Sequence, residues 1–162
     1  MKDQITLERI KLLHPKLRDE ANDIYDEICE ALSGRAICRF AYTLRTFAEQ
    51  DAIYAQGRTK PGKIVSNAKG GLSLHNYGLA VDIVLIVDGK EASWDVKKDF
   101  DGDSKSDWLE IVTIFKQHGW ECGIDWKFVD APHFQKSFGY SVRDLLALYN
   151  AKKVDSHNYV MI

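Results

Sequence analysis

Hydrophobic residues recur at helical spacing near the start of the chain. They follow Pro15, which suits the first position of a helix, at steps of three and four residues: Leu17, Ala21, Ile24, Ile28 and Leu32. This spacing predicts an amphipathic helix that buries one face. Gly34 is the expected stop of that helix.

Two apolar runs predict strands. Residues 36–42 alternate between apolar and polar side chains, as a half-buried strand does, whereas residues 79–87 are almost continuously apolar. Asp88 and Gly89 follow as a hairpin-turn signal. Asp82 is the only charge in the second run, so its carboxylate needs a partner.

Three more segments have helical spacing: residues 46–56 with Gly57 as the stop, 107–118 with Gly119 as the stop, and 141–150. Residues 58–76 contain proline, glycine and few apolar residues, which predicts an extended surface loop. The pattern leaves the order of residues 154–162 open. Helices mixed with short strands favour a small α+β domain, with a mainly antiparallel central sheet flanked by helices.

Composition limits the possible partners. The 162 residues are 45% apolar and 28% charged, which fits one packed domain over residues 1–162 without a separate binding module. The net charge of −2 argues against nucleic acid as a partner. No apolar run reaches the roughly 20 residues of a membrane span, and no long apolar segment resembles a secretory signal. We therefore expect synthesis in the cytoplasm and no membrane insertion. Because no long apolar stripe is left over, we also expect a monomer.

The three cysteines, Cys29, Cys38 and Cys122, are an odd number without the short spacings of a zinc knuckle or a redox pair. We interpret them as buried thiols of a protein made in a reducing compartment.

Candidate chemistry lies in two separated motifs. His75 and Asp82 stand seven residues apart, with Gly78 between them as a bend that lets both side chains face one point. A carboxylate inside an apolar run must be paired. A divalent metal would pair Asp82, and so would Arg39 or Arg45.

The second motif supplies another histidine, His133, with Asp130 three residues before it. Two imidazoles and one carboxylate form the three-ligand set of a catalytic zinc, which leaves a fourth position for water. The remaining acid, Asp130, would then act on that water.

Both motifs resemble the paired signature of the zinc peptidases that cut bacterial cell-wall peptides. The motifs are Ser73-x-His75-x-x-Gly78-x-Ala80-x-Asp82 and Asp130-x-x-His133. This family includes D-alanyl-D-alanine carboxypeptidases and dipeptidases as well as L-alanyl-D-glutamate endopeptidases. The segment from Leu44 to Thr59 resembles the part that carries the family's substrate-binding arginine. Residues 61–65 and 75–80 resemble the L-alanyl-D-glutamate branch, known from phage endolysins and bacterial autolysins.

The resemblance covers roughly residues 15–148 and implies a role for each matching residue. The zinc ligands would be His75, Asp82 and His133, and the general base would be Asp130, where many relatives have glutamate. Arg45 would hold the peptide carbonyl and its developing oxyanion. Ser73 and Gln50 would bind polar groups of the substrate, or act only as a turn-stabilising hydroxyl and a surface amide. Trp126 is placed near the cleft.

The expected activity is zinc-dependent hydrolysis of the peptidoglycan stem peptide at the L-alanyl-D-glutamate bond, by an endolysin or autolysin that reaches the wall after release. Two alternatives remain open at this point. One is cleavage of D-alanyl-D-alanine, and the other is a non-catalytic recognition domain with a structural zinc.

A second metal-like pattern lies further along. Acids occupy positions one, three, five, nine and twelve of a calcium-loop spacing: Asp99, Asp101, Asp103, Asp107 and Glu110. Ser104 stands at position six, where the motif has glycine, and residues 96–98 leave little room for a preceding helix. The pattern therefore indicates either a calcium site or a solvated acidic turn, in which Asp107 caps the following helix.

Overall fold

The structure, a computed structural model, describes residues 2–162. Its framework is a five-stranded sheet in which β1 (Ala36–Tyr42), β2 (Ala80–Val87), β5 (His133–Gln135) and β4 (Glu121–Cys122) lie side by side in that order. The short strand β3 (Glu91–Ser93) pairs with the far end of β2. All the strand pairs are antiparallel, so the prediction of an α+β domain with an antiparallel sheet is confirmed.

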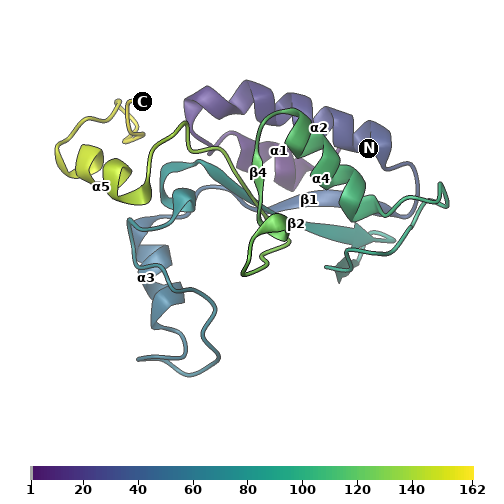
Figure 1. The fold of residues 1–162 in the computed structure, drawn as a ribbon, viewed down its shortest axis with the longest axis horizontal. Helices are drawn as coiled ribbons and strands as arrows, with labels where there is room; N and C mark the ends of the chain where they lie inside the picture. The colour runs from purple at the N-terminus through teal and green to yellow at the C-terminus, as the bar shows by residue number, and fades with distance from the viewer. Residues whose placement is uncertain (1) are drawn as a thin grey trace.

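Besides the sheet, the described residues form five α-helices: α1 (Gln4–Ile10), α2 (Arg18–Ala31), α3 (Phe47–Ala55), α4 (Asp107–Gln117) and α5 (Val142–Asn150). Three 3-10 helices complete the described residues: η1 (Pro15–Leu17), η2 (Leu74–Tyr77) and η3 (Gly123–Asp125). Helices α1, α2 and α4 cover one face of the sheet, whereas α3 and the loop after it project from the opposite side (Figure 1). This arrangement leaves part of one sheet face free to carry a site.

Aromatic side chains fill the layer between the sheet and its helices. Phe40, Phe115 and Phe134 are fully buried, and the rings of Phe115 and Phe134 stack at 4.1 Å between centroids. Successive residues of a strand point to opposite faces. Because Phe134 points into this core, its neighbour His133 points to the free face. Burial of Phe134, which contributes about 1.5–3 kcal/mol, therefore also orients His133.

Several expected elements are present within a residue or two. Helix α3 lies between the caps Thr46 and Gln56, helix α4 ends with His118 as its C-cap, and α5 begins after its N-cap Ser141. Asp88 and Gly89 both have positive φ, 52° and 74°, as the expected hairpin turn requires.

Other elements differ in part from the prediction. The helix predicted from Pro15 begins as the 3-10 turn η1 and continues as α2, which ends at Ala31, before Gly34. Gly34 is needed for another reason, because a Cβ there would lie 2.6 Å from the Cα of Asp101. The segment 58–76 ends in η2 rather than remaining an extended loop, and α1 was not predicted at all.

The C-terminal segment is ordered. Val154 and Val160 form a β-bridge, and His14 donates from Nε2 to the carbonyl of Val160 at 2.7 Å. Cys38 and Cys122 are buried and Cys29 is half-buried, all three as free thiols. None of the helices within residues 2–162 has the length and apolarity to cross a membrane.

Candidate active site

His75, Asp82 and His133 converge on the free face of the sheet. Asp82 and His133 are directly opposed residues of β2 and β5, and His75 comes from η2, just before β2. His75 Nε2 lies 3.3 Å from Asp82 Oδ2, and His133 Nδ1 lies 3.1 Å from Asp82 Oδ1. Ligands about 2.0–2.1 Å from a tetrahedral zinc are roughly 3.3 Å apart. The three side chains therefore stand at zinc-ligand spacing.

Gly78 makes the bend between His75 and Asp82. Its φ of 69° belongs to the left-handed region that favours glycine, and a Cβ at this position would lie 2.5 Å from the backbone nitrogen of His14. The same nitrogen donates to the carbonyl of Gly78 at 2.9 Å. The close approach of the chain at His14 thus fixes the turn that brings His75 back over β2.

Hydrogen bonds set the tautomer of each histidine. His75 donates from Nδ1 to the carbonyl of Thr43 at 2.9 Å, which leaves a lone pair on Nε2. His133 donates from Nε2 to the side-chain oxygen of Gln135 at 2.8 Å, which leaves a lone pair on Nδ1. Gln135 keeps this orientation because its amide group donates to Glu121 at 3.1 Å. Both imidazoles therefore point acceptor nitrogens at the Asp82 carboxylate.

Such a cluster of acceptors fits a divalent cation. His75 Nε2 is buried and has no hydrogen-bond partner among the described residues. Buried polar atoms of this kind are normally satisfied, and imidazole nitrogens with one carboxylate are a common donor set for zinc. The outer partners Thr43 and Gln135 are the kind that orient metal-bound histidines. The residues present thus fit a zinc ion.

The charges of the site shift its pKa values. Burial alone would raise the pKa of Asp82, but the attraction of its carboxylate to the neighbouring His133 and His75, when these rings are protonated, outweighs burial and holds that pKa well below its usual range. Burial lowers the pKa of His133, yet the Asp82 carboxylate favours the protonated ring of the metal-free site and leaves this pKa above the ordinary histidine value. The pKa of Asp130 is raised, first by partial desolvation and then by repulsion from Asp82. Asp130 is thus suited to hold a proton.

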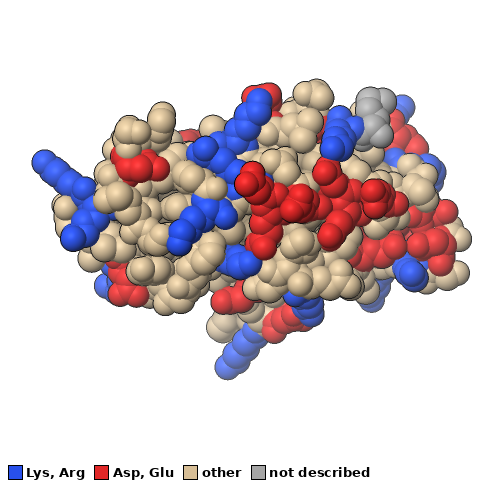
Figure 2. All heavy atoms as spheres, turned by 90° about the horizontal axis from the view of Figure 1, so that it is seen from above, with Lys and Arg blue, Asp and Glu red and all other residues tan. Residues whose placement is uncertain are grey.

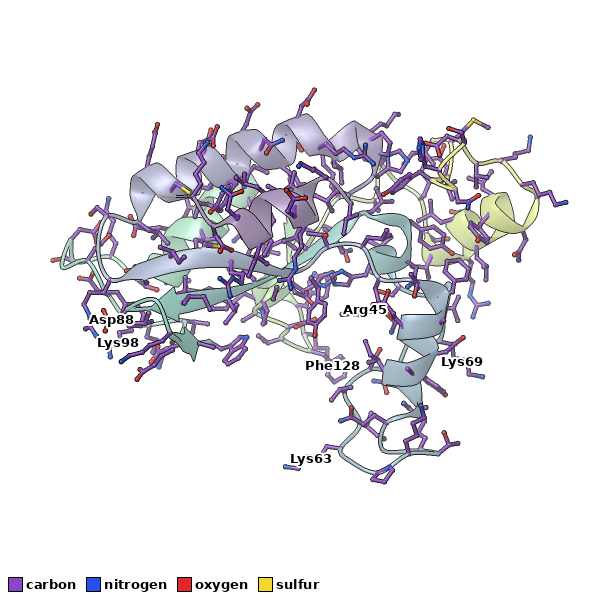
Figure 3. The ribbon with its side chains drawn as sticks, turned by 180° about the vertical axis from the view of Figure 1, so that it is seen from behind. Arg45, Lys63, Lys69, Asp88, Lys98 and Phe128 are labelled. Atoms are coloured by element: carbon purple, nitrogen blue, oxygen red, sulfur yellow. The ribbon has the colours of Figure 1, made fainter. Side chains whose placement is uncertain are left out.

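A cleft of about 490 Å³ opens over this cluster and is lined by Asp130, Arg45 and Tyr42 as well as by the three proposed ligands. In Figure 3, Arg45 lies near the base of α3, and Phe128 and the loop that carries Lys63 both lie below it in this view. Phe128 is 86% exposed, and Ile64 and Val65 of the Lys63 loop are exposed as well. Val65 also lines the cleft, so an exposed apolar side chain borders its polar floor.

Arg45 is held at the floor of the cleft. It donates from Nη1 to Gln50 Oε1 at 3.0 Å, and its Nη2 lies 3.9 Å from Asp82 Oδ2. Its Nε is buried without a partner among residues 2–162. Arg39, the other arginine considered for Asp82, pairs instead with Asp3 at 2.9 Å. The guanidinium of Arg45 is therefore available to an additional acceptor.

Gln50 is fully buried, so it is no surface amide. Its oxygen receives Arg45, and its amide group donates to Ser66 Oγ at 3.0 Å and to the carbonyl of Ala68 at 2.8 Å. Through these three hydrogen bonds, the Gln50 side chain holds Arg45 in place and joins α3 to the loop around Ser66. Its position suits holding the arginine better than contacting a substrate.

Ser73 and Trp126 border the cluster of His75, Asp82 and His133. Ser73 is the N-cap of η2, and its Oγ accepts from the backbone nitrogen of His75 at 3.3 Å. Ser73 also lines the cleft, so the turn-stabilising role and a substrate contact are compatible. The rings of Trp126 and His133 lie 5.2 Å apart between centroids, which places Trp126 beside the cluster as expected.

Sequence reasoning missed the outer partners of the site. Gln135 lies two residues after His133 on one strand, so period-two alternation places both on one face and provides a usable signal. Asn76 donates to the carbonyl of Arg45 at 3.0 Å. Thr43 acts through its backbone carbonyl, for which the side-chain pattern carries no signal.

Comparison with known proteins identifies the class. A family model described as D-alanyl-D-alanine carboxypeptidase, of the M15 peptidases, matches residues 66–136, the stretch that contains both motifs. The peptidoglycan L-alanyl-D-glutamate endopeptidase CwlK of Bacillus subtilis is 44% identical over 125 residues, which are 76% of this chain and 72% of CwlK. The chain belongs to the M15 family of peptidases, and the resemblance inferred from the motifs is confirmed.

A solved structure is similar in fold. The L-Ala D-Glu endopeptidase ChiX of Serratia marcescens aligns with a TM-score of 0.52 at 22% sequence identity, over 83% of this chain and 87% of that chain. At this identity the likeness supports the α+β architecture alone.

Proposed function

We propose that this protein is a zinc peptidase that hydrolyses the stem peptide of peptidoglycan between L-alanine and D-glutamate. The observation that carries the proposal is the convergence of His75, Asp82 and His133 at the floor of an open cleft that Asp130 and Arg45 also line. The 44% identity to CwlK, named for this bond, supports the substrate.

The residues of the site have separate roles in the proposed reaction. Zinc bound by His75, Asp82 and His133 would supply Lewis acidity, which lowers the pKa of water toward about 7 and polarises a carbonyl. Asp130 takes the proton from the attacking water as the new C–O bond forms. It then gives this proton to the leaving amine as the C–N bond breaks. The raised pKa of Asp130 suits a group that must carry the proton between these steps.

Arg45 binds the carbonyl oxygen of the scissile bond and stabilises the negative charge that develops there. Its position on the cleft floor, 3.9 Å from Asp82, places the guanidinium next to the reacting centre. Gln50 keeps the guanidinium in place through its 3.0 Å hydrogen bond. Ser73 and Trp126 contact the substrate on the other side of His133.

The shape of the surface favours an endopeptidase. A second hollow of about 340 Å³ adjoins the cleft and shares Ser73 and His133 with it. A peptide laid across His133 therefore has room to continue on both sides of the cut bond. A carboxypeptidase that releases terminal D-alanine is the second candidate, favoured by the description of the family model.

The biological role we propose is that of a wall-lytic enzyme, an autolysin or phage endolysin, which acts as a monomer after it reaches the cell wall. The bacterial relative CwlK supports the autolysin version.

The deciding experiment is incubation of the zinc-loaded protein with defined muropeptides, followed by mass analysis of the fragments with and without chelator. We expect fragments cut between L-alanine and D-glutamate that disappear with chelator and return with zinc. Release of terminal D-alanine would show that the protein is a carboxypeptidase and not an endopeptidase. If no chelator-sensitive product formed, the remaining hypothesis would be a non-catalytic recognition domain.

A further inference from the structure

Outside the cleft, five carboxylates gather where the loop between β3 and α4 meets the first turn of α4. Asp99, Asp101 and Asp107 each place an oxygen within 4.8 Å of the others, and so do Asp101, Asp103 and Glu110. The two groups share Asp101 and thus form one cluster. Figure 2 shows acidic side chains gathered over this half of the molecule.

Two oxygens of the cluster are buried without a partner. Asp107 is fully buried, and although its Oδ1 accepts from the backbone nitrogen of Phe100 at 2.9 Å, its Oδ2 has no hydrogen bond. Glu110 Oε2 is likewise buried and unpartnered. Within residues 2–162, none of the five acids has a basic side chain within 4.0 Å. A buried carboxylate oxygen normally requires a hydrogen bond or a cation.

Helix capping does not explain the buried position of the Asp107 carboxylate. The N-cap of α4 is Ser106, whose Oγ accepts from the backbone nitrogen of Leu109 at 3.3 Å. The alternative in which Asp107 caps this helix is therefore wrong. Asp107 is instead the first residue of α4, and its carboxylate oxygen lies among those of Asp99 and Asp101.

The loop backbone has the course that a calcium loop needs. Ser104, at the position where the motif has glycine, has a φ of 70° and so takes the conformation that glycine provides there. Asp99 accepts from the backbone nitrogens of Gly102 at 2.7 Å and Ser104 at 2.9 Å. The element directly before the loop is the strand β3, so of the two helices of a hand only the outgoing one, α4, is present.

We propose that the loop from Asp99 to Glu110 binds one Ca²⁺ ion, with the buried oxygens of Asp107 and Glu110 among its ligands. Calcium takes six to eight oxygen ligands, many of them carboxylates, in flexible geometry, whereas magnesium demands a tighter octahedron and keeps its water. Zinc prefers the nitrogen and sulfur donors that this loop lacks.

The electrostatics agree with this assignment. Burial raises the pKa of Glu110 to about 7, and repulsion from Asp103 and Asp101 adds to the effect. A bound cation would remove that repulsion. It would also fasten the loop to the turn before β1, because Asp101 Oδ2 accepts from the backbone nitrogen of Ser33 at 3.3 Å. The ion would therefore stabilise the fold at a distance from the zinc cluster.

The test is a calcium titration of the zinc-loaded protein, freed of calcium, with the melting temperature as readout. We expect a rise of about 5 °C or more at a hundredfold excess over Kd, and a much smaller rise with Mg²⁺. Glu110→Gln and Asp107→Asn, which keep the shape of each side chain, should lose the rise. The matched control Glu30→Gln, on the exposed face of α2, should keep it. An unchanged melting temperature in the wild type, or an equal rise in all variants, would overturn the proposal.

A second variant separates this site from the zinc cluster. His133→Ala should keep the full calcium response, because the proposed calcium ligands are other residues. Loss of the response in His133→Ala would place the ion in the cleft and overturn the assignment. Terbium gives a direct probe of the loop, since Trp108 lies next to Asp107 and can sensitise its emission. Calcium should displace that emission in the wild type, and Glu110→Gln should show none.

Discussion

Asp82 and His133 are directly opposed residues of β2 and β5, so one strand register sets two of the three proposed ligands. Opposed residues of antiparallel strands have Cβ atoms about 4.5–5.5 Å apart, close enough for their side chains to share an ion. A slip of one residue would turn His133 into the core and bring Phe134 out. The buried Phe134 therefore protects the metal geometry as well as the core.

The proposed proton carrier can be separated from the metal. Asp130→Asn should lower turnover of a defined muropeptide by about 10²-fold or more, because an amide cannot take the proton of the attacking water. Zinc content should stay at one ion per chain, because Asp130 is not one of the three ligands. Metal analysis together with a turnover assay checks both. Full activity in Asp130→Asn would remove this residue from the reaction.

Gln135 should tune zinc affinity without touching the ion. Gln135→Leu removes the acceptor that fixes the tautomer of His133, so zinc affinity should fall about 10–100-fold. Competition with a zinc-binding dye measures this change. Gln117→Leu, an exposed position on α4, is the matched control and should leave the affinity unaltered. Equal affinities in the two variants would show that the Gln135 contact is incidental.

Arg45 and Gln50 should behave as a unit. Arg45→Ala should lower kcat by about 10²–10³-fold, as loss of an oxyanion donor does. Gln50→Leu should lower kcat by a smaller factor in the wild type and have little effect in the Arg45→Ala background, because its role passes through the arginine. A double-mutant cycle on kcat tests this. Additive effects on kcat would assign Gln50 an independent role.

These residues also show which parts of the site can be predicted from the sequence. Spacing and resemblance pointed to the three ligands, because each lies in a short motif, and period-two alternation explains why His133 faces outward. The partners of Gln50 could not be read from the sequence, since Ser66 and Ala68 are placed by the path of a loop. The same holds for Thr43, whose carbonyl acts, and for α1, whose buried positions Thr6 and Ile10 do not form a clear stripe.

Glu110 predicts a dependence of stability on pH. Its pKa in the fold is about 7, above the ordinary value of 4.5, so the folded state binds more protons between these two values. In calcium-free buffer this group therefore costs stability progressively as the pH rises from about 4.5 to 7. The melting temperature of Glu110→Gln, minus that of the wild type, should grow over this range. Thermal melts at several pH values check this, and a difference that does not change with pH would contradict it.

The central claim is tested most directly by anomalous diffraction at the zinc edge on crystals of the zinc-loaded protein. The account predicts one peak about 2.0–2.2 Å from His75 Nε2, from a carboxylate oxygen of Asp82 and from His133 Nδ1, with His133 Nε2 still bonded to Gln135. A peak elsewhere, or a zinc bound through His133 Nε2, would contradict the proposed centre.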